Sequence, residues 1–175
     1  MTNLAIFAAG CFWGIEEKFL SHPGVLDTEV GYTGGITKSP NYHDVCTGST
    51  EHAEAVRVKF DQDIISYEDL LVLFFDMHDP TTLNRQGTDA GTQYRSAIFY
   101  QTDTEKKIAK STIKSLLASK TFSNITTEVS KLDIFYDAED YHQDYERNNR
   151  NQPYVRSVSI TRLNEFKAKM PEVLK

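Results

Sequence analysis

Three features are scarce in this chain: cysteine, long apolar runs and clusters of basic residues. Two cysteines among 175 residues cannot build a secreted disulfide framework, which indicates a reducing compartment. No apolar run approaches the length of a membrane span, and the first basic residue, Lys18, comes too late for a signal peptide. A net charge of −6 without a Lys/Arg cluster disfavours nucleic acid. We therefore expect a cytoplasmic protein that begins as mature chain and binds neither membranes nor nucleic acid.

The composition is that of an ordinary globular protein, with 39% hydrophobic and 25% charged residues. The chain is long enough to bury a sizeable core and shows no internal repeat, low-complexity tract or shift in composition. We therefore expect residues 1–175 to form a single domain, and we expect a monomer.

The hydrophobic periodicity predicts strands and helices that alternate along the chain. The predicted strands cover residues 3–9, 25–31, 53–60, 94–100 and 127–135. The predicted helices cover residues 11–20, a segment starting at Ser66, a segment starting at Thr102, and residues 163–170. The core order β-α-β-β-α-β is typical of an α+β, ferredoxin-like split-βαβ fold, a two-layer sandwich.

Two stretches, residues 32–52 and 79–93, do not fit this pattern. Both carry few aliphatic residues and are rich in Gly, Thr, Tyr and His. Loops of this length in a compact domain are usually functional or disordered, and the aromatic residues argue against disorder. We therefore expect two long functional loops.

Cys11 is the first candidate for chemistry, because it lies where a buried strand ends and a helix begins. Unpaired N–H groups and the positive end of the helix dipole stabilise a thiolate there, which is the reactive form of cysteine. The alternative is a small buried hydrophobic residue, since free cysteine is often buried. Phe12 and Trp13 follow directly and are either core residues or a cage for an apolar group.

Glu54 is the second candidate, because the period of its strand places it on the apolar face with Val56, Val58 and Phe60. Burial raises the pKa of a carboxyl group and keeps it protonated near neutral pH, as a general acid requires. The alternative is that Glu54 lies at the open end of the strand and pairs with an arginine.

Two further groups of polar residues were considered for function. His43, Cys46 and His52 have a spacing that matches no structural zinc pattern, so we predict solvated loop histidines and no metal site. The run from Asp140 to Tyr145 is either a solvated helix face or a segment that folds against the two long loops.

Taken together, several motifs resemble those of the A-type methionine sulfoxide reductases. The likeness covers residues 7–145 in the family's order, and such a set is highly specific. The matching segments are GCFWG at 10–14, GYTGG at 31–35, NYHDVCTG at 41–48, HAEAV at 52–56, HDPTTLNRQG at 78–87, GTQYRS at 91–96 and AEDYHQ at 138–143.

This resemblance implies a role for each matching residue. Cys11 would be the nucleophile and Glu54 the acid that protonates the sulfoxide oxygen, with hydrogen bonds to that oxygen from two tyrosines. By the same resemblance, Tyr42 and Tyr94 would donate these hydrogen bonds to the oxygen, and Asp89 would help to hold the polar loop network around it. Phe12 and Trp13 would receive the methyl group on sulfur. The substrate would be the S epimer of methionine sulfoxide, free or in oxidised proteins, and the product on Cys11 a sulfenic acid.

The chain departs from its relatives in two places. Glu51 stands where many relatives have glycine, with little effect expected on the chemistry. Many relatives also keep resolving cysteines in a C-terminal tail, whereas this chain has none after Cys46. The resemblance implies no bound cofactor but an external thiol reductant: thioredoxin, glutaredoxin with glutathione, or dithiothreitol. The alternatives are a thiol peroxidase or another enzyme with a cysteine nucleophile, and a peptide-binding module.

Overall fold

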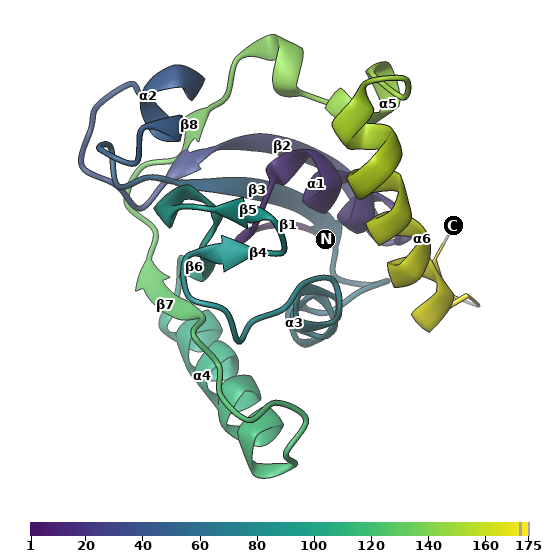
Figure 1. The fold of residues 1–175 in the computed structure, drawn as a ribbon. Helices are drawn as coiled ribbons and strands as arrows, with labels where there is room; N and C mark the ends of the chain where they lie inside the picture. The colour runs from purple at the N-terminus through teal and green to yellow at the C-terminus, as the bar shows by residue number, and fades with distance from the viewer. Residues whose placement is uncertain (172, 175) are drawn as a thin grey trace.

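The computed structural model describes residues 1–171 and 173–174. It shows a central sheet with helices packed around it (Figure 1). The strands of this sheet are, in chain order, β1 (Thr2–Ala9), β2 (Val25–Thr33), β3 (Ala53–Asp61), β6 (Ser96–Tyr100), β7 (Glu128–Lys131) and β8 (Tyr136–Asp137). They lie in the order β7-β6-β1-β3-β2-β8. All pairs are antiparallel except β6 with β7. The fold is thus mixed α and β, as predicted.

The helices and the smaller elements connect and cover these strands. The helices are α1 (Phe12–Leu20), α2 (Tyr42–Cys46), α3 (Tyr67–Asp76), α4 (Asp103–Ala118), α5 (Tyr145–Asn148) and α6 (Ile160–Lys169). The smaller elements are a hairpin of β4 (Arg85–Gln86) and β5 (Asp89–Ala90), 3₁₀ turns at Thr92–Tyr94 and Asp140–His142, and a π-helical turn at Val155–Ser159. The two long loops therefore contain α2 and the β4–β5 hairpin. Within the described residues, no helix is long and apolar enough to cross a membrane.

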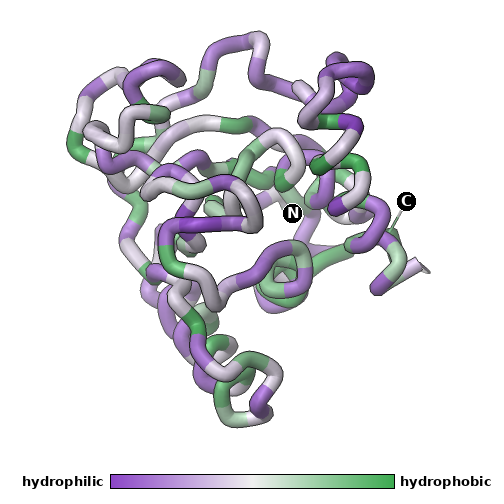
Figure 2. The backbone as a smooth tube through the Cα atoms, in the orientation of Figure 1, coloured by the Kyte–Doolittle hydropathy of each residue, from purple (hydrophilic) through white to green (hydrophobic). Residues whose placement is uncertain are grey.

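From Ala5 onward β1 is buried on both faces, as its continuous apolar sequence predicts, whereas Leu4 at its start is 42% exposed. On one face Ala5 and Phe7 belong to the main core, where α1, α3 and α6 contribute their apolar sides. On the other face Ile6 and Ala8 join a smaller cluster with alanines of β3 and β6. In Figure 2 hydrophobic and hydrophilic residues alternate along α3 and α4, as expected of helices with one covered face.

The strand predicted for residues 127–135 is shorter than expected. Only residues 128–131, which form β7, pair with β6. The chain then crosses the face of the sheet that carries the smaller cluster and reaches β8 at the opposite edge. Leu132 and Phe135 pack there against the small side chains of the second cluster. Because alanines leave room for a backbone segment to approach closely, these two side chains can be covered there. The free energy gained by covering them exceeds that of further strand pairing with β6.

Candidate active site

Cys11 is the N-cap residue of α1 and directly follows the end of β1. The turn between them depends on Gly10, which has φ +102°, and a Cβ atom there would stand 2.8 Å from Cγ of Gln86. Only glycine therefore allows β1, α1 and the β4–β5 hairpin to meet at this point. Cys11 is a free, partly exposed cysteine at their junction.

The pKa of Cys11 contradicts the expectation of a thiolate stabilised by the helix N-terminus. Burial raises the pKa of this thiol well above its usual value, and the charge of Glu54 adds to the increase. Hydrogen bonds of the thiol with the Trp13 backbone and the Tyr154 side chain act in the opposite direction but do not compensate. Loss of hydration thus exceeds the effect of these two hydrogen bonds.

Glu54 lies on β3 with only 1% of its surface exposed. Its Oε1 accepts a hydrogen bond from the Phe12 backbone N–H at 3.2 Å, while the buried Oε2 has no partner among the described residues. Burial raises the pKa of Glu54 to about 8, so the group is protonated at neutral pH. No ion pair to Glu54 is formed within the described chain, which leaves the alternative of pairing with an arginine unsupported.

Tyr42 on α2 and Tyr94 in the 3₁₀ turn of the second long loop are both partly buried and interact with Glu54. Burial raises the pKa of each phenol, and the charge of Glu54 is the next cause in both cases. Both hydroxyls therefore stay protonated and can donate hydrogen bonds. The charge of Cys11 also acts on Tyr94, which places this hydroxyl near the thiol as well.

Asp89, on β5, connects the second long loop to the C-terminal part of the chain. Its Oδ2 accepts a hydrogen bond from the Tyr154 hydroxyl and forms an ion pair with Arg162 at 3.5 Å. Since Tyr154 also contacts Cys11, Asp89 is one residue removed from the thiol. Its place in the structure fits the predicted role in a polar loop network.

Phe12 and Trp13 lie in a group of stacked rings beside Cys11. Trp13 stacks on Tyr145 with ring centroids 3.9 Å apart, and its Nε1–H donates to Nδ1 of His142 at 2.9 Å. The His142 ring in turn lies between Phe12 at 5.3 Å and Tyr42 at 4.3 Å. These contacts fix the Trp13 indole in one orientation.

His142, Tyr145 and Tyr154 were not predicted as site residues. The run from Asp140 to Tyr145 was expected either to be solvated or to fold against the two long loops, and the ring contacts of His142 and Tyr145 place it against the first loop and α1. Aromatic residues within an acidic segment were the available signal for His142 and Tyr145. For Tyr154, which lies between the last matching motif and the predicted C-terminal helix, the sequence offers no signal.

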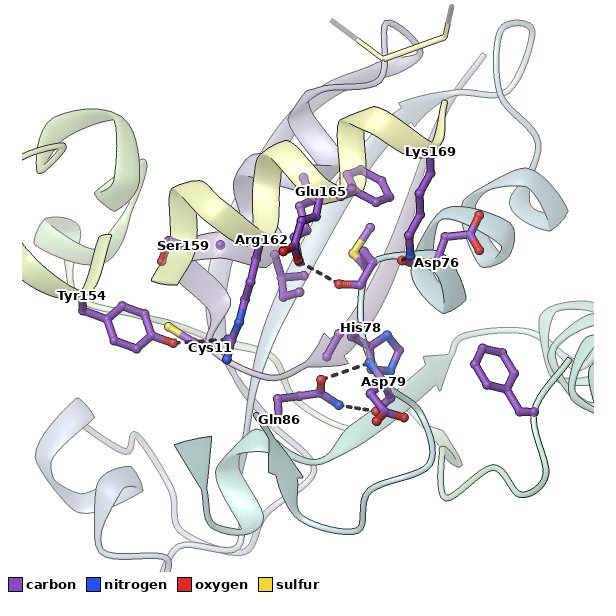
Figure 3. A pocket seen from close by; sticks show the side chains of 17 residues that line it. Cys11, Asp76, His78, Asp79, Gln86, Tyr154, Ser159, Arg162, Glu165 and Lys169 are labelled. Carbon is purple, nitrogen blue, oxygen red and sulfur yellow. Dashed lines mark hydrogen bonds between the residues drawn. The ribbon is translucent and has the colours of Figure 1, made fainter. Parts of the chain in front are cut away.

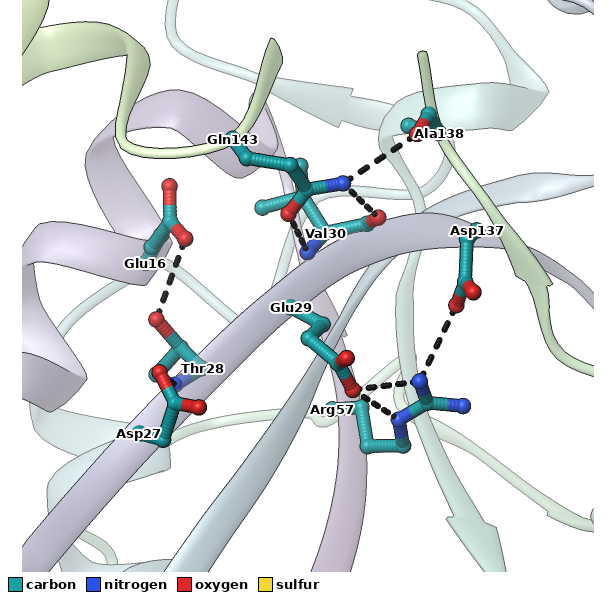
Figure 4. A network of polar contacts seen from close by, with 9 residues as sticks. All are labelled: Glu16, Asp27, Thr28, Glu29, Val30, Arg57, Asp137, Ala138 and Gln143. Carbon is teal, nitrogen blue, oxygen red and sulfur yellow. Dashed lines mark hydrogen bonds and ion pairs between the residues drawn. The ribbon is translucent and has the colours of Figure 1, made fainter. Parts of the chain in front are cut away.

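Hydrogen bonds attach this late segment to β2, as Figure 4 shows for Gln143 and Val30, and to α1 through Glu16. The Gln143 amide bonds both the N–H and the C=O of Val30, at 2.9 and 3.0 Å. The Asp144 N–H donates to Glu16 at 3.0 Å, and the Glu139 carboxylate accepts from the Tyr32 hydroxyl and the Tyr42 N–H. The position of the stacked rings is therefore set by a polar network that also holds α2.

The prediction of solvated histidines in the first loop holds for His43, which is exposed, and is wrong for His52, which is buried. His52 accepts a hydrogen bond from the Gly35 N–H at 3.0 Å and contacts the Thr37 carbonyl at 2.7 Å, so its ring binds the backbone of the loop. In the part of the chain that the structure describes, no three His, Cys, Asp or Glu side chains gather as metal ligands. Glu51, next to His52, adopts φ +59°, a left-handed conformation that suits the glycine of relatives.

A free cysteine at a helix N-terminus, a buried protonated carboxyl and two tyrosine hydroxyls define a cysteine-dependent enzyme site. Comparison with known proteins specifies the class. The sequence model described as peptide methionine sulfoxide reductase matches residues 3–173. The chain therefore belongs to the peptide methionine sulfoxide reductase family, which are oxidoreductases, and the resemblance seen in the sequence is confirmed.

Individual relatives agree with this assignment. The MsrA of Methanothermobacter thermautotrophicus is 49% identical over 160 residues, covering 90% of this chain and 95% of the relative. The MsrA of Pasteurella multocida is 46% identical over 178 residues and the full length of both chains. Among solved structures, reduced Mxr1 from Saccharomyces cerevisiae has a TM-score of 0.80 at 36% identity, covering 86% of this chain and 87% of that one. Methionine sulfoxide reductase A of Corynebacterium diphtheriae has a TM-score of 0.76 at 38% identity, covering 85% and 76%. These relatives favour methionine sulfoxide reduction over the thiol peroxidase alternative.

Proposed function

We propose that this enzyme reduces the S epimer of methionine sulfoxide, free or within oxidised proteins, with Cys11 as the nucleophile and Glu54 as the acid. The observation that carries the proposal is the buried Oε2 of Glu54, which has no partner within the described chain. A protonated carboxyl with a free oxygen beside a thiol is the donor that a sulfoxide oxygen needs. Phe12 and Trp13 would receive the methyl group on sulfur.

The residues suggest the following sequence of steps. A sulfoxide sulfur is a poor electrophile until its oxygen is protonated or strongly hydrogen-bonded. Glu54 transfers its proton to the oxygen while Tyr42 and Tyr94 donate hydrogen bonds, which stabilises the charge of the transition state. The Cys11 thiolate attacks the sulfur, and the intermediate collapses to methionine and a Cys11 sulfenic acid.

For regeneration we propose a one-cysteine cycle with an external thiol. Cys46 ends α2, is exposed, and shares a hydrogen bond with the Tyr42 hydroxyl. This hydrogen bond places Cys46 at the edge of the site, where the thiol can support Tyr42 and does not need to react with Cys11. A thioredoxin-like protein is one candidate reductant, because a solved relative is Mxr1 from Saccharomyces cerevisiae in complex with Trx2.

Three broader features belong to the same proposal. The strand order β6-β1-β3-β2 with antiparallel pairing supports a ferredoxin-like split-βαβ core, extended by β7 and β8. The sheet and its covering helices share one main core, which supports a single domain over residues 1–175. Both cysteines are free thiols, as a monomer in the reducing cytoplasm would keep them.

The proposal is tested by Cys11→Ser in a single-turnover assay of methionine formation. We expect no methionine above background, because an alcohol is not ionised near neutral pH and does not attack sulfur as a thiolate does. The near-isosteric change should leave the circular dichroism spectrum and the thermal midpoint unchanged. Methionine formation at more than a trace level by the folded variant would show that Cys11 is not the nucleophile.

A further inference from the structure

A cavity of about 380 Å³ lies between α1, α6 and the loop after α3, and Cys11 forms part of its wall (Figure 3). Its volume lies in the range of small-molecule pockets, about 300–1,000 Å³. Cys11, Tyr154 and Arg162 lie at one end of the cavity, and Asp76 and Lys169 lie at the other (Figure 3). A protein reductant could not enter this volume, whereas a small molecule could.

The cavity is separate from the place proposed for the sulfoxide. Of the predicted site residues, only Cys11 lines it; Glu54, Tyr42, Tyr94, Phe12 and Trp13 do not. The groups proposed to hold the sulfoxide oxygen therefore lie outside the cavity wall. Cys11 belongs to both, because it lines the cavity and also interacts with Glu54 and Tyr94.

The cavity wall combines charges of both signs with apolar surface. Its cations are Lys18, Arg162 and Lys169, and its anions are Asp76, Asp79 and Glu165. Two of the cations bond to backbone carbonyls, Lys18 to Met77 and Lys169 to Asp76. Such a wall suits a ligand that carries both carboxylate and ammonium groups.

We propose that this cavity binds the reducing thiol, and that its ligand is a low-molecular-weight zwitterionic thiol of the amino-acid or short-peptide class. The inference rests on the function proposed above. After reduction of the substrate, the oxygen on the Cys11 sulfur faces Glu54 and the tyrosines. Displacement at a divalent sulfur takes place in line with the leaving group, so a thiolate in the cavity is on the side from which attack succeeds.

The atoms and electrons of the cycle balance as follows. The ligand thiolate forms an S–S bond to Cys11, the S–O bond breaks, and the hydroxide leaves as water after taking one proton. A second thiol then attacks the ligand sulfur of this mixed disulfide and releases the Cys11 thiol. Two thiols are oxidised to one disulfide for each sulfoxide reduced to its thioether.

The test uses full-length enzyme first converted to the sulfenic acid with one equivalent of methionine sulfoxide. Glutathione, a zwitterionic thiol, or dithiothreitol, which is uncharged, is then mixed in, and recovery of the Cys11 thiol is followed by mass spectrometry. With glutathione we expect a rate that saturates with concentration. In the Lys169→Glu variant, the rate of thiol recovery at low glutathione concentration should fall about five- to tenfold. The rate of recovery with dithiothreitol should not change.

Lys110→Glu is the matched control, since Lys110 is exposed on α4 and does not line the cavity. It should stay within about twofold of the wild type. A linear glutathione dependence, or equal rates in the wild type and Lys169→Glu, would overturn the proposal. So would a change in KM for methionine sulfoxide with the glutathione rate unchanged, because the cavity would then belong to the substrate. Absence of the first equivalent of methionine would instead contradict the proposed function itself.

Discussion

Glu54 and Cys11 illustrate how burial sets the chemistry of single residues. Burial raises the pKa of each group, although Cys11 keeps part of its surface exposed. For the carboxyl the result is useful, because a pKa of about 8 keeps a proton available at neutral pH. For the thiol the result is a resting state that is not ionised at neutral pH, so ionisation has to accompany the reaction with the sulfoxide.

Glu54→Gln should slow the single-turnover formation of methionine at pH 7 by about two to four powers of ten, the range for a positioned general acid. Glutamine can donate a hydrogen bond but cannot transfer a proton. Because the acid is lost as the pH rises through about 8, the difference between the wild type and the variant should shrink above that pH. Stopped-flow rates from pH 6 to 9.5 would measure both effects. A variant as fast as the wild type at pH 7 would transfer the role of acid to Tyr42 or Tyr94.

Cys46→Ser should retain steady-state activity with dithiothreitol, because the one-cysteine cycle does not use this thiol. A thiol count of the wild type after one turnover without reductant should show the loss of one thiol. Loss of both thiols, with a Cys11–Cys46 bridge in the peptide map, would make Cys46 the resolving residue and contradict the cycle.

At the scale of elements, α3 shows how a local sequence signal determines a helix start. The Ser66 hydroxyl accepts a hydrogen bond from the Asp69 N–H, and the Asp69 carboxylate accepts one from the Ser66 N–H. The predicted helix start at Ser66 is confirmed, and the spacing of Ser66 and Asp69 accounts for it. The α4 helix starts as predicted at Thr102, and Leu117 near its end is 39% exposed because α4 extends beyond the sheet.

Ser66→Ala should lower the free energy of unfolding by about 1 kcal/mol, the usual cost of losing an N-cap side chain. Because Ser66 is distant in sequence from the site residues and caps a helix of the core, catalytic constants should not change. Urea titration measures the effect. Ser111→Ala, in the exposed interior of α4, is the control and should shift stability by less than about 0.5 kcal/mol. Equal stability of Ser66→Ala and the wild type would show that the capping box contributes nothing.

For the whole molecule, three buried carboxyl groups around α1 link stability to pH. Burial raises the pKa of Glu16 and Glu54 to about 8, and that of Glu146 to about 7. An acid with a higher pKa in the folded state binds more protons when folded. Its contribution to stability is therefore complete below the usual value of 4.5 and is lost as the pH rises through the folded value. Lys18 acts in the opposite direction above pH 8, because burial lowers its pKa to about 8.

The thermal midpoint should therefore fall between pH 5 and pH 8. Both carboxyl oxygens of Glu146 are buried without a hydrogen-bond partner in the described chain, so this residue gives the clearest test. Glu146→Gln should reduce the loss of stability over this pH range by about 1–3 kcal/mol, because an amide does not ionise. Calorimetry at several pH values measures it, with Glu68→Gln, at an exposed position, as the control. An unchanged pH dependence in Glu146→Gln would show that Glu146 does not titrate in this window.

Much of this protein was determined by its sequence alone. Local patterns of apolar and polar residues, which act over a few neighbours in the chain, predict four features. These are the strand β1, the capping box of α3, the helix after Cys11 and the burial of Glu54. The family follows from motifs spread over most of the sequence, in order.

Tertiary structure alone decided the rest, because the interactions involved join residues far apart in the chain. His142 and Tyr145 contact Trp13 because Gln143 and Glu139 hold the late segment against β2 and α2. The pKa of Cys11 depends on how completely neighbouring elements exclude water, which no local pattern reports. The cavity behind Cys11 exists only because α6 packs along α1, so its walls come from segments up to 160 residues apart, from Ala9 to Lys169.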